Sequence, residues 1–275
     1  MADRQTLAAS PAILTRLFGL DERIAVVVGG AGRIGGPLCH ALSAAGATVC
    51  ILDVNQDAAD QLAAKIAKDT GRRVLVQSAD ATREDQLRGS LADITQQCGT
   101  PDILIHAAQF RGGAFYSSDV AGYPREAWDR VIETNLTSVH LACQVFGGAM
   151  AAASGGKIAV LGSTYGLVSP DPRIYGHSGV NSPVSYAAAK SALVGMVRYL
   201  AVHWRERNVR VNCLAPGGVF DEQSPEFVEN YCRRTPLGRM ARAEDYQGAV
   251  LFMVSPASDY MTGAVVTVDG GWTAW

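Results

Sequence analysis

The chain has 275 residues, of which 48% are apolar and 18% are charged, and its formal net charge is -2. This composition allows a sizeable core and excludes a disordered chain. The near-neutral charge gives no indication of nucleic acid or an anionic membrane surface as a partner.

Apolar runs alternate with longer helical patterns from about residue 20 onward. Several runs are almost continuous in Val, Ile and Leu, as strands covered on both faces require. The expected strands are 24–28, 48–52, 74–77, 103–106, 157–161, 209–213 and 265–268. The expected helices are 34–45, 58–68, 84–97, 125–152, 184–207 and 243–254. This alternation predicts one α/β domain over 21–275, with a doubly wound parallel sheet of about seven strands and helices on both faces.

Three segments depart from the alternation. Residues 1–20 form an N-terminal extension in which Ser10 and Pro11 predict the N-cap and first residue of a short helix. Residues 164–183, with three prolines and three glycines, and residues 216–242 are long and irregular. Irregular segments of this length inside a compact domain are often functional.

The first strand runs directly into the glycine loop Gly29–Gly35, and a helix follows. Glycines allow a tight turn and a close approach to a pyrophosphate, and the helix N-terminus offers N–H groups to it. Asp53 ends the second strand, where a carboxylate binds ribose hydroxyls and repels a 2′-phosphate, so NAD is favoured over NADP. Arg33 could reach a 2′-phosphate, but the favoured interpretation is that it is solvated or meets the pyrophosphate. Asp80 either contacts the adenine amine or caps the helix near Thr82.

Tyr186 and Lys190 are four residues apart in a predicted helix and therefore lie on one face, a turn apart. A cation beside a phenol favours the phenolate and lowers the pKa of the phenol. The pair therefore predicts a general acid/base that works near neutral pH.

Further landmarks follow in order: Asn135 in Glu-Thr-Asn-Leu, Ser163 after the fifth strand, Pro216-Gly217 after the sixth, and the Val-Asp-Gly-Gly that ends at Gly271. With the glycine loop and the Tyr/Lys pair, the chain resembles the short-chain dehydrogenase/reductase family from residue 20 to 275. The resemblance implies a Rossmann-type fold and hydride transfer between a nicotinamide and a carbonyl or alcohol carbon. It also implies a homotetramer, with a dimer as the alternative.

The resemblance implies a role for each matching residue. Tyr186 exchanges the proton, Lys190 lowers the pKa of Tyr186 and binds the nicotinamide ribose, Ser163 binds the reacting oxygen, and Asn135 anchors a proton-relaying water chain. The expected cofactor-binding residues are Gly29, Gly32, Arg33, Ile34, Gly35, Asp53, Asp80, Ala107, Ala108, Lys190, Pro216, Gly217 and Val219.

The chain departs from the family pattern at several positions. Val28 replaces the threonine that opens the loop, Arg33 stands in place of a glycine, and Phe220-Asp221 replaces a threonine near the nicotinamide. The family's Asn-Asn-Ala-Gly reads 106–109 His-Ala-Ala-Gln, in which we interpret His106 as structural.

Ser163 and Tyr186 are 23 residues apart, which is longer than the separation of about a dozen that the resemblance predicts. The extra residues form an insertion within 164–183 that should overhang the substrate, and 216–242 should form a lid. The candidate substrate contacts are Tyr165, Arg173, Tyr175 and His177. The alternative for the insertion is an inert loop or a subunit contact.

The polar insertion favours a sugar-like or polyol substrate, and with the tail Gly270–Trp275 it resembles the sugar-pathway branch of the family, including flagellin-modification and nonulosonic-acid dehydrogenases. The alternatives are a ketoreductase of another small carbonyl or acyl thioester, and a dinucleotide-sensing regulator without turnover.

The six cysteines are scattered and form no Cys-x-x-Cys pair, which is typical of reduced thiols. The sequence has no signal-like N-terminus and no apolar run of about 18 residues. We therefore expect a cytoplasmic protein with a small-molecule substrate, no metal site and no nucleic-acid or membrane partner.

Overall fold

The strands of the protein form a single parallel sheet. The computed structural model describes residues 11–112, 116, 120–178 and 181–275. In this part of the chain seven strands pair in the order β3-β2-β1-β4-β5-β6-β7. They are β1 (Ile24–Val28), β2 (Thr48–Asp53), β3 (Val74–Ser78), β4 (Ile103–His106), β5 (Gly156–Leu161), β6 (Val209–Pro216) and β7 (Val265–Val268). The strand order reverses between β1 and β4, which opens a crevice at their carboxyl ends.

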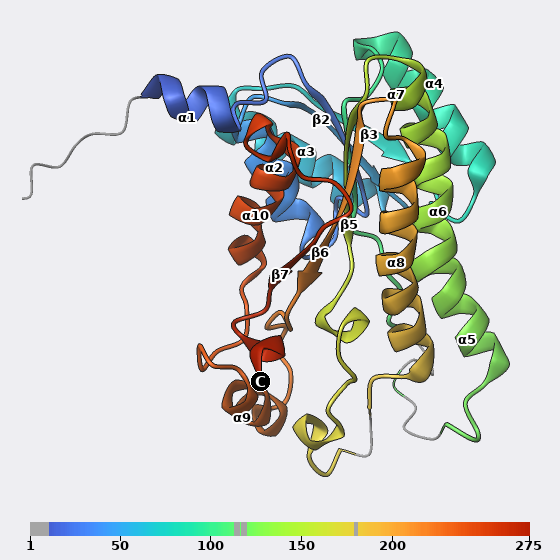
Figure 1. Ribbon diagram of the computed structural model, residues 1–275, viewed down its shortest axis with the longest axis vertical. Helices are drawn as coiled ribbons and strands as arrows, with labels where there is room; N and C mark the ends of the chain where they lie inside the picture. The colour runs from blue at the N-terminus through green and yellow to red at the C-terminus, as the bar shows by residue number, and fades with distance from the viewer. Residues whose placement is uncertain (1–10, 113–115, 117–119, 179–180) are drawn as a thin grey trace, which may run out of the picture.

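Helices cover both faces of the sheet, as the alternation predicts (Figure 1). They are α1 (Pro11–Phe18), α2 (Gly35–Ala44), α3 (Gln56–Thr70), α4 (Glu84–Cys98), α5 (Arg125–Ile132), α6 (Ser138–Ala142), α7 (Gly148–Ala152), α8 (Val184–His203), α9 (Pro225–Arg234) and α10 (Gln247–Val254). α2, α3 and α10 pack on one face, and α4 to α8 pack on the other. The doubly wound fold class is thus confirmed.

The burial of the strands explains why their sequences are continuous apolar runs. Along β1, Val26 and Val28 pack into the cluster beneath α4 and α8, whereas Ala25 and Val27 pack into the cluster beneath α2 and α10. All four side chains are almost completely buried. Burial on both faces removes the polar alternation of a half-exposed strand.

Several boundaries differ from the prediction. The predicted helix 125–152 is continuous but contains two wide π-helical turns, Glu133–Thr137 and Cys143–Gly147, between α5, α6 and α7. The segment 216–242 was predicted to be irregular, and this is wrong for its centre, because α9 occupies Pro225–Arg234. The Ser224 hydroxyl caps α9 by accepting a bond from the Phe227 N–H. The predicted cap Ser10 lies outside the described residues, and α1 begins at Pro11.

No helix in the described ranges has both the length and the apolar character to cross a bilayer.

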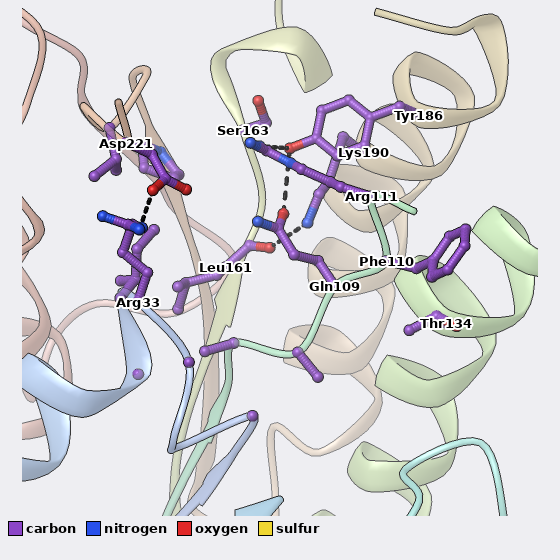
Figure 2. A pocket seen from close by; sticks show the side chains of 18 of the residues that line it. Arg33, Gln109, Phe110, Arg111, Thr134, Leu161, Ser163, Tyr186, Lys190 and Asp221 are labelled. Carbon is purple, nitrogen blue, oxygen red and sulfur yellow. Dashed lines mark hydrogen bonds and ion pairs between the residues drawn. The ribbon is translucent and has the colours of Figure 1, made fainter. Parts of the chain in front are cut away.

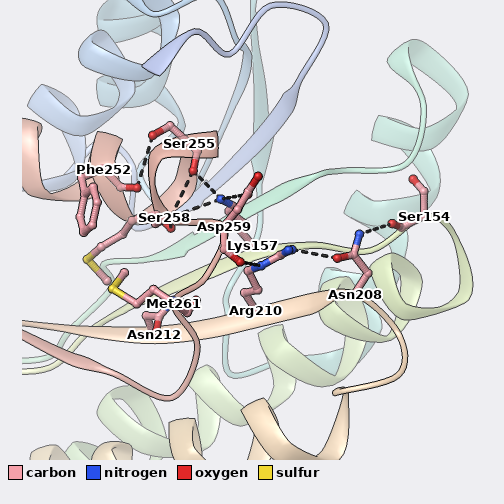
Figure 3. Close-up of polar contacts among 11 residues, drawn as sticks. Ser154, Lys157, Asn208, Arg210, Asn212, Phe252, Ser255, Ser258, Asp259 and Met261 are labelled. Carbon is pink, nitrogen blue, oxygen red and sulfur yellow. Dashed lines mark hydrogen bonds and ion pairs between the residues drawn. The ribbon is translucent and has the colours of Figure 1, made fainter. Parts of the chain in front are cut away.

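A polar network at the amino ends of β5 and β6 anchors the connection from α10 to β7 (Figure 3). The Lys157 ammonium donates to the Ser255 carbonyl and pairs with Asp259. The buried Asn212 amide donates to the Met261 carbonyl at 3.1 Å and accepts from the Ala264 N–H at 3.0 Å. These bonds satisfy backbone groups that no strand neighbour reaches.

Asn212→Leu is expected to lower the free energy of unfolding by about 2–4 kcal/mol, because two partly buried backbone groups lose their partner. Chemical denaturation monitored by circular dichroism measures the loss. Gln61→Leu, on the exposed side of α3, is the control and should change stability little. A loss below about 0.5 kcal/mol for Asn212→Leu would show that this network does not stabilise the fold.

Candidate active site

A cavity of about 850 Å³ lies at the carboxyl ends of the strands. Its size is at the upper end of the range for small-molecule sites. Its walls come from the glycine loop after β1, the ends of β2 and β3, residues 107–111 after β4, Ser163 after β5 and residues 216–219 after β6. Tyr186 and Lys190 of α8 complete the wall opposite the glycine loop.

Two glycines of the loop lie so close to neighbouring backbone atoms that neither position has room for a side chain. Gly29 has a positive φ of 73°, and a Cβ there would lie 2.5 Å from the Ala108 nitrogen. A Cβ on Gly35 would lie 2.2 Å from the Gly29 carbonyl oxygen. The loop therefore presents bare backbone to the cavity at the start of α2, as a pyrophosphate-binding turn requires.

The two predicted adenosine-side carboxylates both line the cavity. Asp53 Oδ2 accepts a bond from the Ala31 N–H at 3.0 Å, and Oδ1 accepts one from the Asn55 N–H. Asp53 thus ties the end of β2 to the glycine loop while remaining at the cavity wall. Asp80 Oδ1 accepts bonds from the N–H and hydroxyl of Thr82, which close a turn ahead of α4, whose N-cap is Arg83 without a side-chain capping bond.

Arg33 links the glycine loop to the segment that follows β6. Its guanidinium forms an ion pair with Asp221, and Nη1 donates to the Phe220 carbonyl at 3.5 Å (Figure 2). Both partners belong to the segment after β6 that departs from the family pattern. The substitution at 220–221 therefore supplies a partner for the arginine that replaces a loop glycine.

The predicted acid/base group lies on the first turns of α8. Tyr186 is buried, and Lys190 Nζ lies 5.6 Å from the centroid of its ring and donates to the Leu161 carbonyl at 2.9 Å. Ser163 follows β5 and also bonds the Tyr186 hydroxyl. The helix spacing and the strand end thus bring Ser163, Tyr186 and Lys190 to one place.

A second cation meets the same phenol. Arg111 Nη2 donates to the Tyr186 hydroxyl at 3.1 Å, and the guanidinium lies 5.4 Å from the ring centroid (Figure 2). Burial alone raises the pKa of Tyr186, but the charges of Arg111 and Lys190 and the hydrogen bonds from Arg111 and Ser163 lower it to about 8. The phenol is therefore poised to exchange a proton near neutral pH.

Asn135 binds the backbone of the loop after β4. It lies in the first π-helical turn, and its Oδ1 accepts from the Phe110 N–H at 2.6 Å while Nδ2 donates to the Phe110 carbonyl at 3.3 Å. Asn135 is fully buried, so its amide fixes the loop after β4 from behind. The water chain expected at Asn135 stays a prediction.

The insertion brings only part of its predicted set to the cavity. Tyr165 and Tyr175 line the wall, and burial raises the pKa of both phenols, that of Tyr175 to about 12. Arg173 and His177 do not line it, which corrects their predicted role. Arg173 folds back onto Asp171 of its own loop, with Nε and Nη2 each 2.8 Å from a carboxylate oxygen.

Aromatic packing holds the insertion against α9. The Tyr175 ring lies 5.3 Å from Phe227, and Tyr231 stacks on Trp272 at 4.4 Å between ring centroids. Trp272 is buried in this cluster, whereas Trp275 is exposed. Phe227 and Tyr231 also line the cavity, so the insertion and α9 form one wall over Tyr186.

Sequence reasoning missed the side chains at 109–111. Gln109 Oε1 lies 3.5 Å from the Tyr186 hydroxyl, and Arg111 contacts it directly. The available signal was their place immediately after the fourth strand. His106 was interpreted as structural, and this agrees with its position: burial lowers its pKa to about 3, and Nε2 lies 3.1 Å from the Ser138 hydroxyl.

In the described ranges no group of three His, Cys, Asp or Glu side chains is arranged to hold a metal ion.

Comparison with known proteins matches residues 29–273 to a family described as enoyl-(acyl carrier protein) reductase. The chain is 32% identical to a galactitol 2-dehydrogenase (L-tagatose-forming) from Cereibacter sphaeroides, over 94% of this chain and 98% of that protein. It is 30% identical to an NAD-dependent glycerol dehydrogenase from Listeria innocua, over 93% and 96%. The crystal structure of a short-chain type dehydrogenase/reductase from Mycobacterium marinum is similar, with a TM-score of 0.83, 30% identity and coverage of 94% and 98%.

Proposed function

The chain belongs to the short-chain dehydrogenase/reductase family and is a nicotinamide-dependent oxidoreductase of that family, and from this premise we propose that it interconverts a secondary alcohol and a ketone on a polar, polyol-like substrate. The observation that carries this proposal is the meeting of Tyr186, Lys190 and Ser163 opposite a bare glycine loop. Similarity to polyol dehydrogenases supports the substrate class. The hydroxyl-rich wall around Tyr175, Ser178 and Ser182 supports it independently.

The residues present fit a nicotinamide dinucleotide. Gly29, Gly32 and Gly35 would cradle its pyrophosphate, Asp53 its adenosine ribose, and Lys190 and 216–219 its nicotinamide end. When bound, it supplies or accepts the hydride.

Proton transfer falls to the chain itself. Ser163 and Tyr186 would hold the reacting oxygen by hydrogen bonds. In alcohol oxidation the Tyr186 phenolate accepts the hydroxyl proton, and in ketone reduction the phenol donates it. The cations at Lys190 and Arg111 stabilise the phenolate at either stage.

Absorbance of the reduced cofactor tests this proposal directly. The purified protein is mixed with NAD or NADP and a panel of alditols, aldoses and aldonic acids at several pH values. We expect at least one member of the panel to be oxidised. Dinucleotide binding without turnover of any member of the panel would instead favour the regulator alternative.

Alcohol oxidation is expected to accelerate with pH and to reach half its plateau near pH 8, because only the Tyr186 phenolate accepts the proton. Ketone reduction should decline through the same pH, because it needs the phenol. The pH dependence of kcat/KM in both directions measures this. If kcat/KM changed with pH in the same direction for oxidation and for reduction, Tyr186 would not be the titrating group.

We propose NAD as the preferred cofactor, because the Asp53 carboxylate would face the ribose and repel a 2′-phosphate. Asp53→Asn keeps the bond-accepting oxygen and removes the charge. We expect the ratio of kcat/KM for NAD over NADP to fall at least about tenfold, mainly through a lower KM for NADP. Asp57→Asn, an exposed charge removal in α3, is the control. An unchanged ratio would show that residues other than Asp53 set the preference for NAD over NADP.

We also propose a homotetramer, with a dimer as the alternative. Val184, Tyr199 and Val202 expose apolar surface along α8, which supports a subunit contact on this helix. Sedimentation analysis of the purified protein tests it.

A further inference from the structure

The Arg111 guanidinium has hydrogen-bond donors that the acid/base chemistry does not use. A guanidinium has five N–H donors and stays charged at any physiological pH. Among the described residues, Tyr186 is the one that accepts a hydrogen bond from Arg111, and none of their carboxylates forms an ion pair with it. Arg111 lines the cavity, so its remaining donors border the space beside the reacting oxygen.

Among the described residues, the carboxylates of the cavity wall lie on one side of it, together with Arg33, whose charge is paired with Asp221. Among the described lining residues the carboxylates are Asp53, Asp80 and Asp221, and all three belong to the glycine-loop side. The side facing α8 carries Arg111, Arg130 and Lys190. Figure 2 shows the division, with Arg33 and Asp221 on one side and Arg111, Tyr186 and Lys190 on the other. Among the described residues of the second side, an anion would therefore meet positive charge and neutral donors but no carboxylate.

The backbone holds Arg111 in place. The Asn135 amide forms hydrogen bonds with both the N–H and the carbonyl of Phe110, the residue immediately before Arg111. On the other side, the Arg130 guanidinium lies 5.5 Å from the centroid of the Phe110 ring. An arginine whose loop is fixed in this way can bind a carboxylate with two parallel hydrogen bonds at little entropic cost.

We propose that Arg111 binds a carboxylate of the substrate and that the substrate is a 2- or 3-hydroxy acid, most simply a polyhydroxylated one. This rests on the proposed function. Arg111 Nη2 lies 3.1 Å from the Tyr186 hydroxyl, so a carboxylate on the guanidinium lies next to an oxygen held by Tyr186 and Ser163. Only an acid whose carbinol carbon is bonded to the carboxylate carbon, or lies one carbon further along, can place its carboxylate on Arg111 and its hydroxyl oxygen on Tyr186.

The reaction is balanced without another reactant. In oxidation the hydroxyl proton passes to Tyr186, the carbon-bound hydrogen leaves as hydride to oxidised nicotinamide, and the carbinol becomes a ketone. The carboxylate is unchanged and remains on Arg111. Tyr165, Tyr175 and Ser182 then face the rest of the molecule and are suited to further hydroxyls.

Matched substrates and variants test the assignment. The probes are erythronate and gluconate, their neutral amides, and the alditols erythritol and glucitol. We expect the wild type to favour each acid over its amide at least about tenfold in kcat/KM, and Arg111→Gln to raise KM for the acids roughly a hundredfold. KM for amides and alditols should change less than about threefold in Arg111→Gln. Arg125→Gln, at an exposed arginine outside the cavity, is the charge-matched control.

A role for Arg111 in tuning Tyr186 alone predicts a different result. Arg111→Gln would then lower kcat/KM for acids, amides and alditols by one common factor, and high pH would restore all of them. That outcome overturns the carboxylate assignment and leaves the proposed function intact. Calorimetry of the acids with the protein and reduced cofactor adds a readout without turnover. If calorimetry shows that the wild type binds no acid more tightly than its amide, the carboxylate assignment also fails. An absence of turnover with every alditol, aldose and aldonic acid of the larger panel would instead overturn the proposed function itself.

Discussion

Tyr186→Phe is expected to lower turnover at least about a hundredfold while the affinity for the cofactor stays nearly unchanged. The substitution removes the hydroxyl that exchanges the proton. It keeps the ring, which packs against Val131, Phe110 and Tyr165 in the core of this wall. We expect binding of the dinucleotide to depend mainly on the glycine loop and the ends of β2 and β6, which supply other parts of the cavity wall.

Steady-state kinetics in both directions and fluorescence titration of the dinucleotide measure the two quantities separately. Tyr199→Phe is the matched control, because Tyr199 lies on the same helix, is 68% exposed and is absent from the cavity wall. Turnover of Tyr186→Phe within tenfold of the wild type would remove Tyr186 from the chemistry. An equal loss in Tyr199→Phe would point to a disturbed α8 instead.

Gly35→Ala is expected to weaken dinucleotide binding at least about a hundredfold and to cost roughly 1–3 kcal/mol of stability. The new Cβ would lie 2.2 Å from the Gly29 carbonyl oxygen and 2.9 Å from the Gly30 Cα. Both are backbone atoms of the same loop, so no side chain can rotate away to make room. The loop must move, and the N–H groups that would face the pyrophosphate must move with it.

The neighbouring Gly36→Ala provides an unusually close control. Its Cβ would be 3.5 Å from the Leu62 side chain, which is ordinary contact, and both glycines lie at the start of α2. Alanine also favours a helix over glycine, so Gly36→Ala should bind normally and be slightly more stable. Comparison of the dissociation constants for NAD and of the unfolding midpoints decides the point. Equal affinities in the two variants would mean that the loop does not cradle the pyrophosphate.

The sequence predicted segments best where the structure depends on neighbours in the chain. Each buried strand needs an apolar run, so all seven strands were found, with errors of a few residues such as the longer β6. The error at 216–242 came from overlooking Ser224-Pro225, an N-cap followed by a proline that begins α9. The Arg173 error was similar, since Asp171 stands two residues away and pairs with it.

The sequence by itself determined the fold class, the glycine loop at the end of β1 and the Tyr186/Lys190 pair, because helix and strand periodicities set which nearby residues share a face. Only the tertiary structure decided which distant side chains meet. Arg111 and Tyr186 are 75 residues apart and come together because β4 lies beside β5 and α8 packs against β6 and the short helix that follows β5. Asn135 likewise reaches Phe110 from a neighbouring helix, and Arg33 reaches Asp221 because the loops after β1 and β6 both lie at the carboxyl end of the sheet. Sequence spacing contains no information on such contacts, since they depend on strand order and on loop conformations outside any regular period.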